Sequence, residues 1–187
     1  MRLIYIITKF ILFPGTYLRG FFEHLTCKLL HLEVESTGYL RADEISGHVE
    51  HLLASATPSA WVMATLPGFF MFNIGVSFMY FGVLNVFYMG ITPYDSLPLF
   101  IIYCVSMYLG ASCINSLFPM TEDVLQLWSL TYSKREHKNA LTAILSIIVK
   151  VILFPWALIT RIGAFLEKNC INFLILVAYF VIHIVTM

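Results

Sequence analysis

Histidines and carboxylates gather in one part of this 187-residue chain. Four of the six histidines (His24, His31, His48 and His51) and six of the eleven acidic residues lie between residues 23 and 51. Read as a helix, Glu44, His48 and His51 follow an i, i+4, i+7 spacing that stacks them on one face. Imidazole and carboxylate groups in this arrangement form a ligand set for zinc or a similar divalent ion. The pattern favours a metal site, and a solvated, charge-rich segment beside the membrane is the alternative interpretation.

A second polar group lies further along the chain, between Asn115 and Asp123. Its proline is expected to end a helix, and Asp123 would then reach the same side of the membrane as Glu23 and His24. Asp123 is therefore a further candidate ligand. The structural alternative is that Thr121, with the two acids that follow it, starts an amphipathic helix, because N-caps and first turns favour these residue types.

The elements that must position these side chains are apolar helices. The chain is 59% hydrophobic and 12% charged, with 11 basic and 11 acidic residues, and average soluble domains carry about twice that charged fraction. Residues 52–94 and 96–121 contain no Asp, Glu, Lys, Arg or His, whereas a helix needs about 20 apolar residues to cross a bilayer. We therefore expect an all-α integral membrane protein with four or five transmembrane helices and a His/Glu-rich polar insert after the first span.

The predicted architecture is a single transmembrane domain over residues 1–187. Its expected spans are 3–31 (kinked at Pro14), 60–88, 97–118, 140–165 and 171–187, with the polar insert at 32–59 and a loop at 119–139. Basic residues occur in 19–59 and in 119–139 but not in 90–96. The positive-inside rule therefore places both polar segments, including the loop 119–139, in the cytoplasm.

Small residues indicate how two of these spans meet. Gly68, Gly75 and Gly82 recur at intervals of seven, which places them near one face of the 60–88 helix. A stripe of small residues lets a neighbouring helix approach closely. We expect this stripe to be a packing surface and not the lining of a pore.

A small transporter or channel subunit is the alternative function from a different class. Lys9 and Lys150 lie inside apolar stretches, where ionisable side chains are candidates for function; their long stems could instead carry the amines to the interface. Residues 6–14 and 147–155 match at seven of nine positions, including both lysines, Pro14 and Pro155. Paired, proline-interrupted helices occur in transporters with repeated halves, and similar apolar composition is the other explanation of the match.

Several of these features together resemble one family. The chain resembles the membrane-embedded metallopeptidase-like proteins of the site-2 protease type. The resemblance rests on Phe13-Pro14-Gly15 on the first span, the Glu23-His24 pair with Cys27, Gly47-His48-Val49-Glu50-His51, and the stretch Asn115–Asp123 after a later span. In that family an H-E-x-x-H helix supplies two zinc ligands and a general base, and an Asp after an Asn-Pro motif supplies a third ligand. The resemblance implies a zinc metallopeptidase-like hydrolase of a bacterial cell membrane, with a membrane protein as substrate or partner subunit.

The chain departs from this family at the central motif. Where H-E-x-x-H is expected it reads Arg19-Gly20-Phe21-Phe22-Glu23, and no H-E-x-x-H occurs in the sequence. One outcome is a rebuilt site at the cytoplasmic membrane edge with zinc ligands His24, His48, His51 and Asp123, and with Glu23 or Glu44 as the base for a zinc-bound water. The other is a fold kept without hydrolysis, whose polar insert binds a partner or another membrane subunit. Arg19 and Glu23 at i, i+4 also predict an intrahelical ion pair.

Other ligand classes are not indicated. The sequence contains neither the phosphate-binding G-x-x-x-x-G-K-[ST] motif nor G-x-G-x-x-G, which argues against a nucleotide. Nucleic-acid binding is not expected either, because the balanced charge lacks the basic excess that such proteins carry. The expected surroundings are the lipid bilayer and other membrane proteins.

Overall fold

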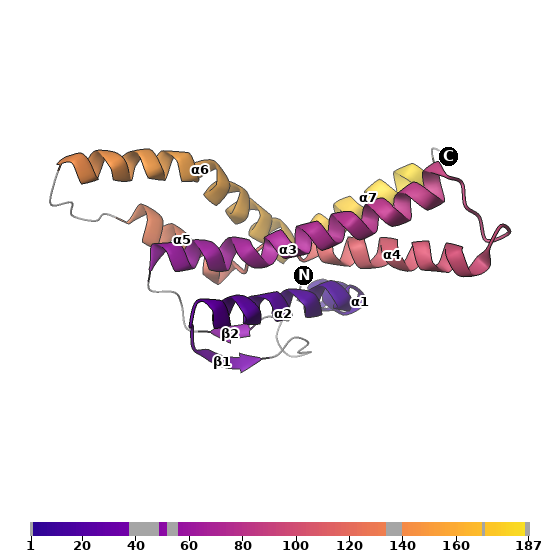
Figure 1. Ribbon diagram of the computed structural model, residues 1–187, viewed down its shortest axis with the longest axis horizontal. Helices are drawn as coiled ribbons and strands as arrows, with labels where there is room; N and C mark the ends of the chain where they lie inside the picture. Colours follow the sequence, from indigo (N-terminus) through magenta and orange to yellow (C-terminus); the bar gives the residue numbers. More distant parts are fainter. Residues whose placement is uncertain (1, 38–48, 52–55, 134–139, 170, 186–187) are drawn as a thin grey trace.

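The computed structural model describes residues 2–37, 49–51, 56–133, 140–169 and 171–185, which are mostly helical and include one two-stranded sheet (Figure 1). In chain order the elements are α1 (Arg2–Ile11), α2 (Phe13–Leu29), β1 (Val34–Thr37), β2 (Val49–His51), α3 (Thr57–Val83), the π-helical turn η1 (Leu84–Tyr88), α4 (Leu97–Asn115), α5 (Thr121–Tyr132), α6 (Ala140–Lys168) and α7 (Ile171–Val185). The helical content agrees with the predicted class, whereas the strands were not expected.

Three helical segments are long and apolar enough to cross a membrane: Thr57–Tyr88, Leu97–Asn115 and Ser146–Glu167. They correspond to the spans predicted at 60–88, 97–118 and 140–165, and they indicate a membrane protein. Helix α7 corresponds to the span predicted at 171–187, but with 15 residues it is shorter than the three long segments. The span predicted at 3–31 is divided into α1 and α2, with Leu12 between them.

Helices α3 and α4 lie side by side because glycines remove the side chains between them (Figure 1). A Cβ atom added at Gly75 would lie 3.2 Å from the Cβ atom of Cys113, and one added at Gly82 would lie 2.8 Å from the carbonyl oxygen of Tyr103. Helix α4 contributes Gly110 to the same contact. The close helix packing predicted from the glycine stripe is confirmed.

Helix α5 packs beside the other half of α3, and α6 packs on α5. The Trp61 indole N–H donates to Thr131 Oγ1 at 3.1 Å, and the Trp128 indole N–H donates to the carbonyl oxygen of Ala157 at 3.3 Å. Helix α6 bends along its length in Figure 1 and contains Pro155, whose missing N–H and ring contacts kink a helix. The amphipathic helix predicted from Thr121 onward is confirmed as α5, but its N-cap is Met120 and makes no side-chain cap bond, so the capping role predicted for Thr121 is wrong.

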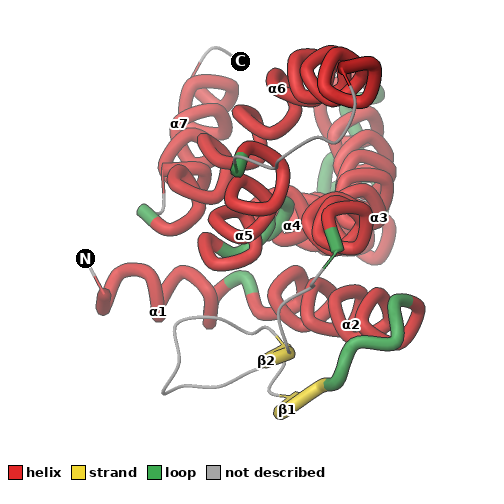
Figure 2. The backbone as a smooth tube through the Cα atoms, turned by 90° about the vertical axis from the view of Figure 1, so that its left-hand side faces the viewer, coloured by secondary structure: helices red, strands yellow, loops and turns green. Residues whose placement is uncertain are grey.

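Helices α1 and α2 form a layer against one side of the other helices (Figure 2). In α2, Thr16, Arg19, Glu23, Thr26 and Cys27 are buried against the rest of the protein. The opposite side carries a large apolar residue at every fourth position, each about half exposed: Phe13, Tyr17, Phe21, Leu25 and Leu29. The charged face of α2 therefore points inward and its apolar face points outward, which is the reverse of a helix on a water-soluble protein.

The segment after α2 corrects the prediction of a helical polar insert. Helix α2 ends at Leu29 and is followed by His31 at φ 54°. The Leu32 N–H is bonded to the carbonyl oxygen of Cys27 at 2.9 Å, which is the geometry of a Schellman C-cap. An antiparallel pair, β1 and β2, follows. Because residues 49–51 are extended, the helical stacking predicted for His51 is wrong; Glu44 and His48 lie outside the described residues.

Candidate functional site

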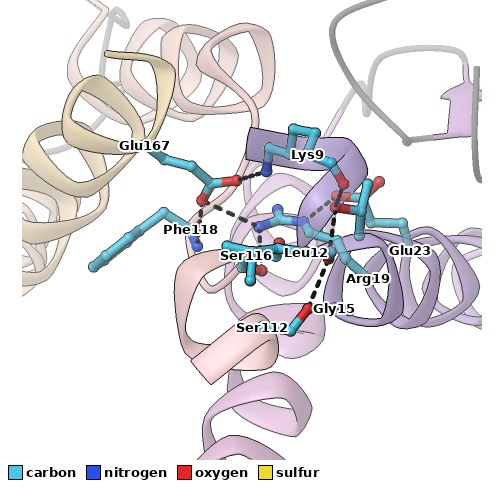
Figure 3. Close-up of polar contacts among 10 residues, drawn as sticks. Lys9, Leu12, Gly15, Arg19, Glu23, Ser112, Ser116, Phe118 and Glu167 are labelled. Carbon is cyan, nitrogen blue, oxygen red and sulfur yellow. Dashed lines mark hydrogen bonds and ion pairs between the residues drawn. The ribbon is translucent and has the colours of Figure 1, made fainter. Parts of the chain in front are cut away.

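A group of four charged side chains lies where α1, α2 and α6 meet (Figure 3). We call Lys9, Arg19, Glu23 and Glu167 the ion cluster. Arg19 Nε donates to Glu23 Oε1 at 2.6 Å, and the Lys9 amine is hydrogen bonded to Glu167 Oε1. The guanidinium also approaches Glu167 Oε2 to 3.9 Å. Two cations therefore balance two carboxylates away from water, as buried charges require.

The segment that joins α4 to α5 is bonded to this cluster through its backbone. The Arg19 guanidinium donates through Nη1 to the carbonyl oxygen of Ser116 at 3.1 Å, and the backbone N–H of Phe118 donates to Glu167 Oε2 at 3.1 Å. These bonds satisfy one carbonyl group and one N–H group of the segment between α4 and α5. The ion cluster thereby fixes the position of residues 116–118.

A tight crossing of α2 over α4 sets the position of Arg19. The Gly15 N–H donates to Ser112 Oγ at 2.7 Å, and the same hydroxyl donates to the carbonyl oxygen of Leu12 at 2.7 Å. A Cβ atom at Gly15 would lie 2.0 Å from the carbonyl oxygen of Ser112. Glycine is therefore required here, and it holds the first turn of α2 directly against α4, one helical turn before Arg19.

The predicted ion pair between Arg19 and Glu23 is confirmed. Their side chains are 7% and 2% exposed, so the pair is buried and not a surface contact. Glu23 was also predicted as a catalytic base, and its carboxylate here accepts a hydrogen bond from the guanidinium. An arginine has five N–H donors and no acceptor, so Arg19 cannot serve as a zinc ligand.

Two of the four predicted metal ligands lie together. His51 Nε2 is 3.5 Å from Asp123 Oδ1, with 6% and 10% of the side chains exposed, and Asp123 also interacts electrostatically with Arg19. His24 is half-buried on α2. His48 lies outside the described residues. Across the described ranges, no group of three or more His, Cys, Asp or Glu side chains is placed to hold a metal ion.

The lysines behind the alternative of a transporter have different surroundings. Lys9 belongs to the ion cluster, whereas Lys150 donates to the carbonyl oxygen of Ser133 at 3.3 Å near the surface. Their prolines also differ, since Pro14 lies in the first turn of α2 and Pro155 lies inside α6. The two matching sequence segments therefore do not form equivalent structures.

Glu167 is the member of the cluster that sequence reasoning missed. A signal for it existed: a lysine in an apolar stretch requires a counter-charge, and Glu167 closely follows the span predicted at 140–165. The 158 residues between Lys9 and Glu167 prevented that pairing from being read along the sequence.

No family model, curated protein or solved structure matches the chain. Function is therefore inferred from the residues themselves. Their arrangement can neutralise buried charge and join four helices, and it places one imidazole next to one carboxylate.

Proposed function

We propose that this protein is a non-catalytic membrane scaffold that is organised like the site-2 protease type and binds a membrane-protein partner without cleaving it. The observation that carries the proposal is the buried ion pair of Arg19 and Glu23, with its 2.6 Å contact. These two residues occupy the i and i+4 positions at which the resembled family has its two zinc-binding histidines. We therefore propose that a structural ion pair replaces the two zinc-binding histidines of the resembled family.

The contacts of the pair support a structural role and not a chemical one. A general base must be free to take a proton from water or substrate, and its pKa and hydrogen-bond geometry must suit that task. The Glu23 carboxylate instead accepts a short, charge-assisted hydrogen bond, and its partner Arg19 also holds the backbone of Ser116. Such bonds are strong, and their loss leaves buried groups without partners.

We further propose that α1 and α2 are embedded in the bilayer together with the three long apolar segments. The support is the orientation of α2, which presents its aromatic and leucine side chains outward and its charges inward. In a membrane, charged groups face the protein interior and apolar groups face lipid. Helix α7 is included for the same reason, because its described side chains at Leu174, Ile175 and Ile182 are largely exposed.

The test compares the stability and zinc content of two variants of the full chain in detergent. Glu23→Gln removes the buried charge, and Glu122→Gln, on an exposed residue in the first turn of α5, is the matched control. We expect Glu23→Gln to destabilise the protein by about 3–5 kcal/mol, because the buried Arg19 loses the carboxylate that is hydrogen bonded to it, and to leave the zinc content unchanged. Preserved stability combined with loss of a zinc-dependent hydrolysis would overturn the proposal.

A metal site at His51 and Asp123 is the second candidate function, and the 3.5 Å approach of these two side chains favours it. In the sequence prediction His24 and His48 complete the ligand set. Metal analysis of the purified wild-type chain, of His51→Ala and of Asp123→Asn is the test. Stoichiometric metal that is lost in both variants would support this candidate, and equal, near-zero metal in all three proteins would eliminate it.

A further inference from the structure

An apolar pocket opens between α3, α6 and the segment that joins α4 to α5. Its volume is about 470 Å³, which lies within the range of about 300–1,000 Å³ that ligand pockets occupy. The residues that form its walls include Gly68, Phe69, Phe72, Phe118, Trp156 and Ile159. The ends of these walls are open to the outside, since Phe69 and Trp156 are 62% and 52% exposed.

The two hydroxyl groups of the pocket do not need a hydrogen-bond partner from a ligand. Thr65 Oγ1 donates to the carbonyl oxygen of Trp61 at 2.7 Å, and Thr160 Oγ1 donates to the carbonyl oxygen of Ala157 at 2.9 Å. Each hydroxyl is therefore satisfied by its own helix. The remaining walls are hydrocarbon and aromatic, so that a polar ligand would lose its hydrogen bonds to water without replacement.

The floor of the pocket is the other side of the segment that closes the ion cluster. The Phe118 ring lies directly over Gly163, where an added Cβ atom would come within 2.0 Å of it, and it points away from the charges (Figure 3). The N–H of the same residue donates to Glu167. The pocket is thus built on a backbone that is held by buried hydrogen bonds, which favours a preformed site over a transient gap.

We propose that this pocket binds one acyl chain of a bilayer phospholipid. Its two long walls belong to Thr57–Tyr88 and Ser146–Glu167, which are both able to span a membrane, so lipid hydrocarbon is the medium at its opening. A helix from a partner protein is about 10–12 Å wide and would fill the volume with about one turn, whereas a single flexible chain can enter between the helices.

The experiment reconstitutes the full chain in phosphatidylcholine vesicles that contain a trace of phosphatidylcholine with a photoactivatable group on one acyl chain. After illumination, labelled peptides are mapped by mass spectrometry. We expect more labelling of the pocket walls at residues 64–72 and 117–119 than of the outer faces of α4 and α7, which are equally apolar. Even labelling of all lipid-facing helices would overturn the proposal, and this readout needs no variant.

Two substitutions on α6 provide a matched comparison. Ile159 lines the pocket and Ile162 does not, and both are 49% exposed. Ile159→Trp should fill the pocket and reduce labelling of residues 64–72 about tenfold, which corresponds to about 1.4 kcal/mol of lost binding, while Ile162→Trp should leave it unchanged. Equal labelling in the two variants, with both monodisperse and helical, would contradict a defined acyl-chain site.

Discussion

The ion pair of Arg19 and Glu23 makes the sharpest quantitative prediction, in the form of a double-mutant cycle. Arg19→Met removes the guanidinium and keeps most of the apolar stem. Glu23→Gln removes the charge and keeps the shape. The third variant combines both changes and therefore removes both buried charges at once.

The expected magnitudes follow from burial. The side chains of Glu23 and Arg19 are 2% and 7% exposed. Each single variant therefore deprives a buried charge of the partner that is hydrogen bonded to it, which costs about 3–5 kcal/mol. The double variant removes both partners at once. Its loss should fall short of the sum of the single losses by about 0.5–3 kcal/mol, which is the interaction range for contacting residues.

The assay is unfolding of the detergent-purified full chain, followed by the fluorescence of its tryptophans. Glu122→Gln serves as the surface control and should stay within about 0.5 kcal/mol of the wild type. If both single variants also stay within that range, or if their losses simply add, the pair does not stabilise the fold and the reasoning is refuted.

Two further predictions use matched positions. At Gly110 an added Cβ atom would lie 2.6 Å from the backbone nitrogen of Met79, so alanine should destabilise the protein by about 1–3 kcal/mol and leucine by more. At Gly90, which has φ +64° and no atom within 4 Å of an added Cβ, alanine and leucine should each destabilise by about 1 kcal/mol. If the loss of unfolding free energy increases equally with side-chain size at the two glycines, the account of α3–α4 packing is contradicted. Lys9→Met, which removes a buried partner of Glu167, should destabilise far more than Lys150→Met, because the Lys150 amine donates to the carbonyl oxygen of Ser133 near the surface. Equal losses for the two lysines in the same measurement would contradict this assignment.

Long apolar stretches with few charges were sufficient to predict the three long apolar segments, and glycine spacing was sufficient to predict the close packing of α3 against α4. The absence of charge over residues 52–94 and 96–121 fixes where helices can cross a membrane, and Gly75 and Gly82 make the approach of α4 possible. The pair of Arg19 and Glu23 could also be predicted, because residues four apart on a helix are neighbours.

Long-range pairing and the polar insert could not be read in the same way. Lys9 and Glu167 come from opposite ends of the chain, and the sequence around each residue does not indicate which residue it pairs with. Helical spacing was applied to His51, but Val49–His51 pairs with Val34–Thr37 as a strand. The juxtaposition of His51 with Asp123 therefore arises from the sheet and from the start of α5, and not from one helical face.

The measurement that tests the central claim most directly is the zinc stoichiometry of the variant Arg19→His, Glu23→His. If the ion pair stands where the resembled peptidases carry zinc ligands, two histidines at i and i+4 with Asp123 nearby complete a three-ligand site. The account predicts that the folded variant gains one zinc per chain above the wild type, and that adding Asp123→Asn removes it. A folded variant that binds no more zinc than the wild type would contradict the claim.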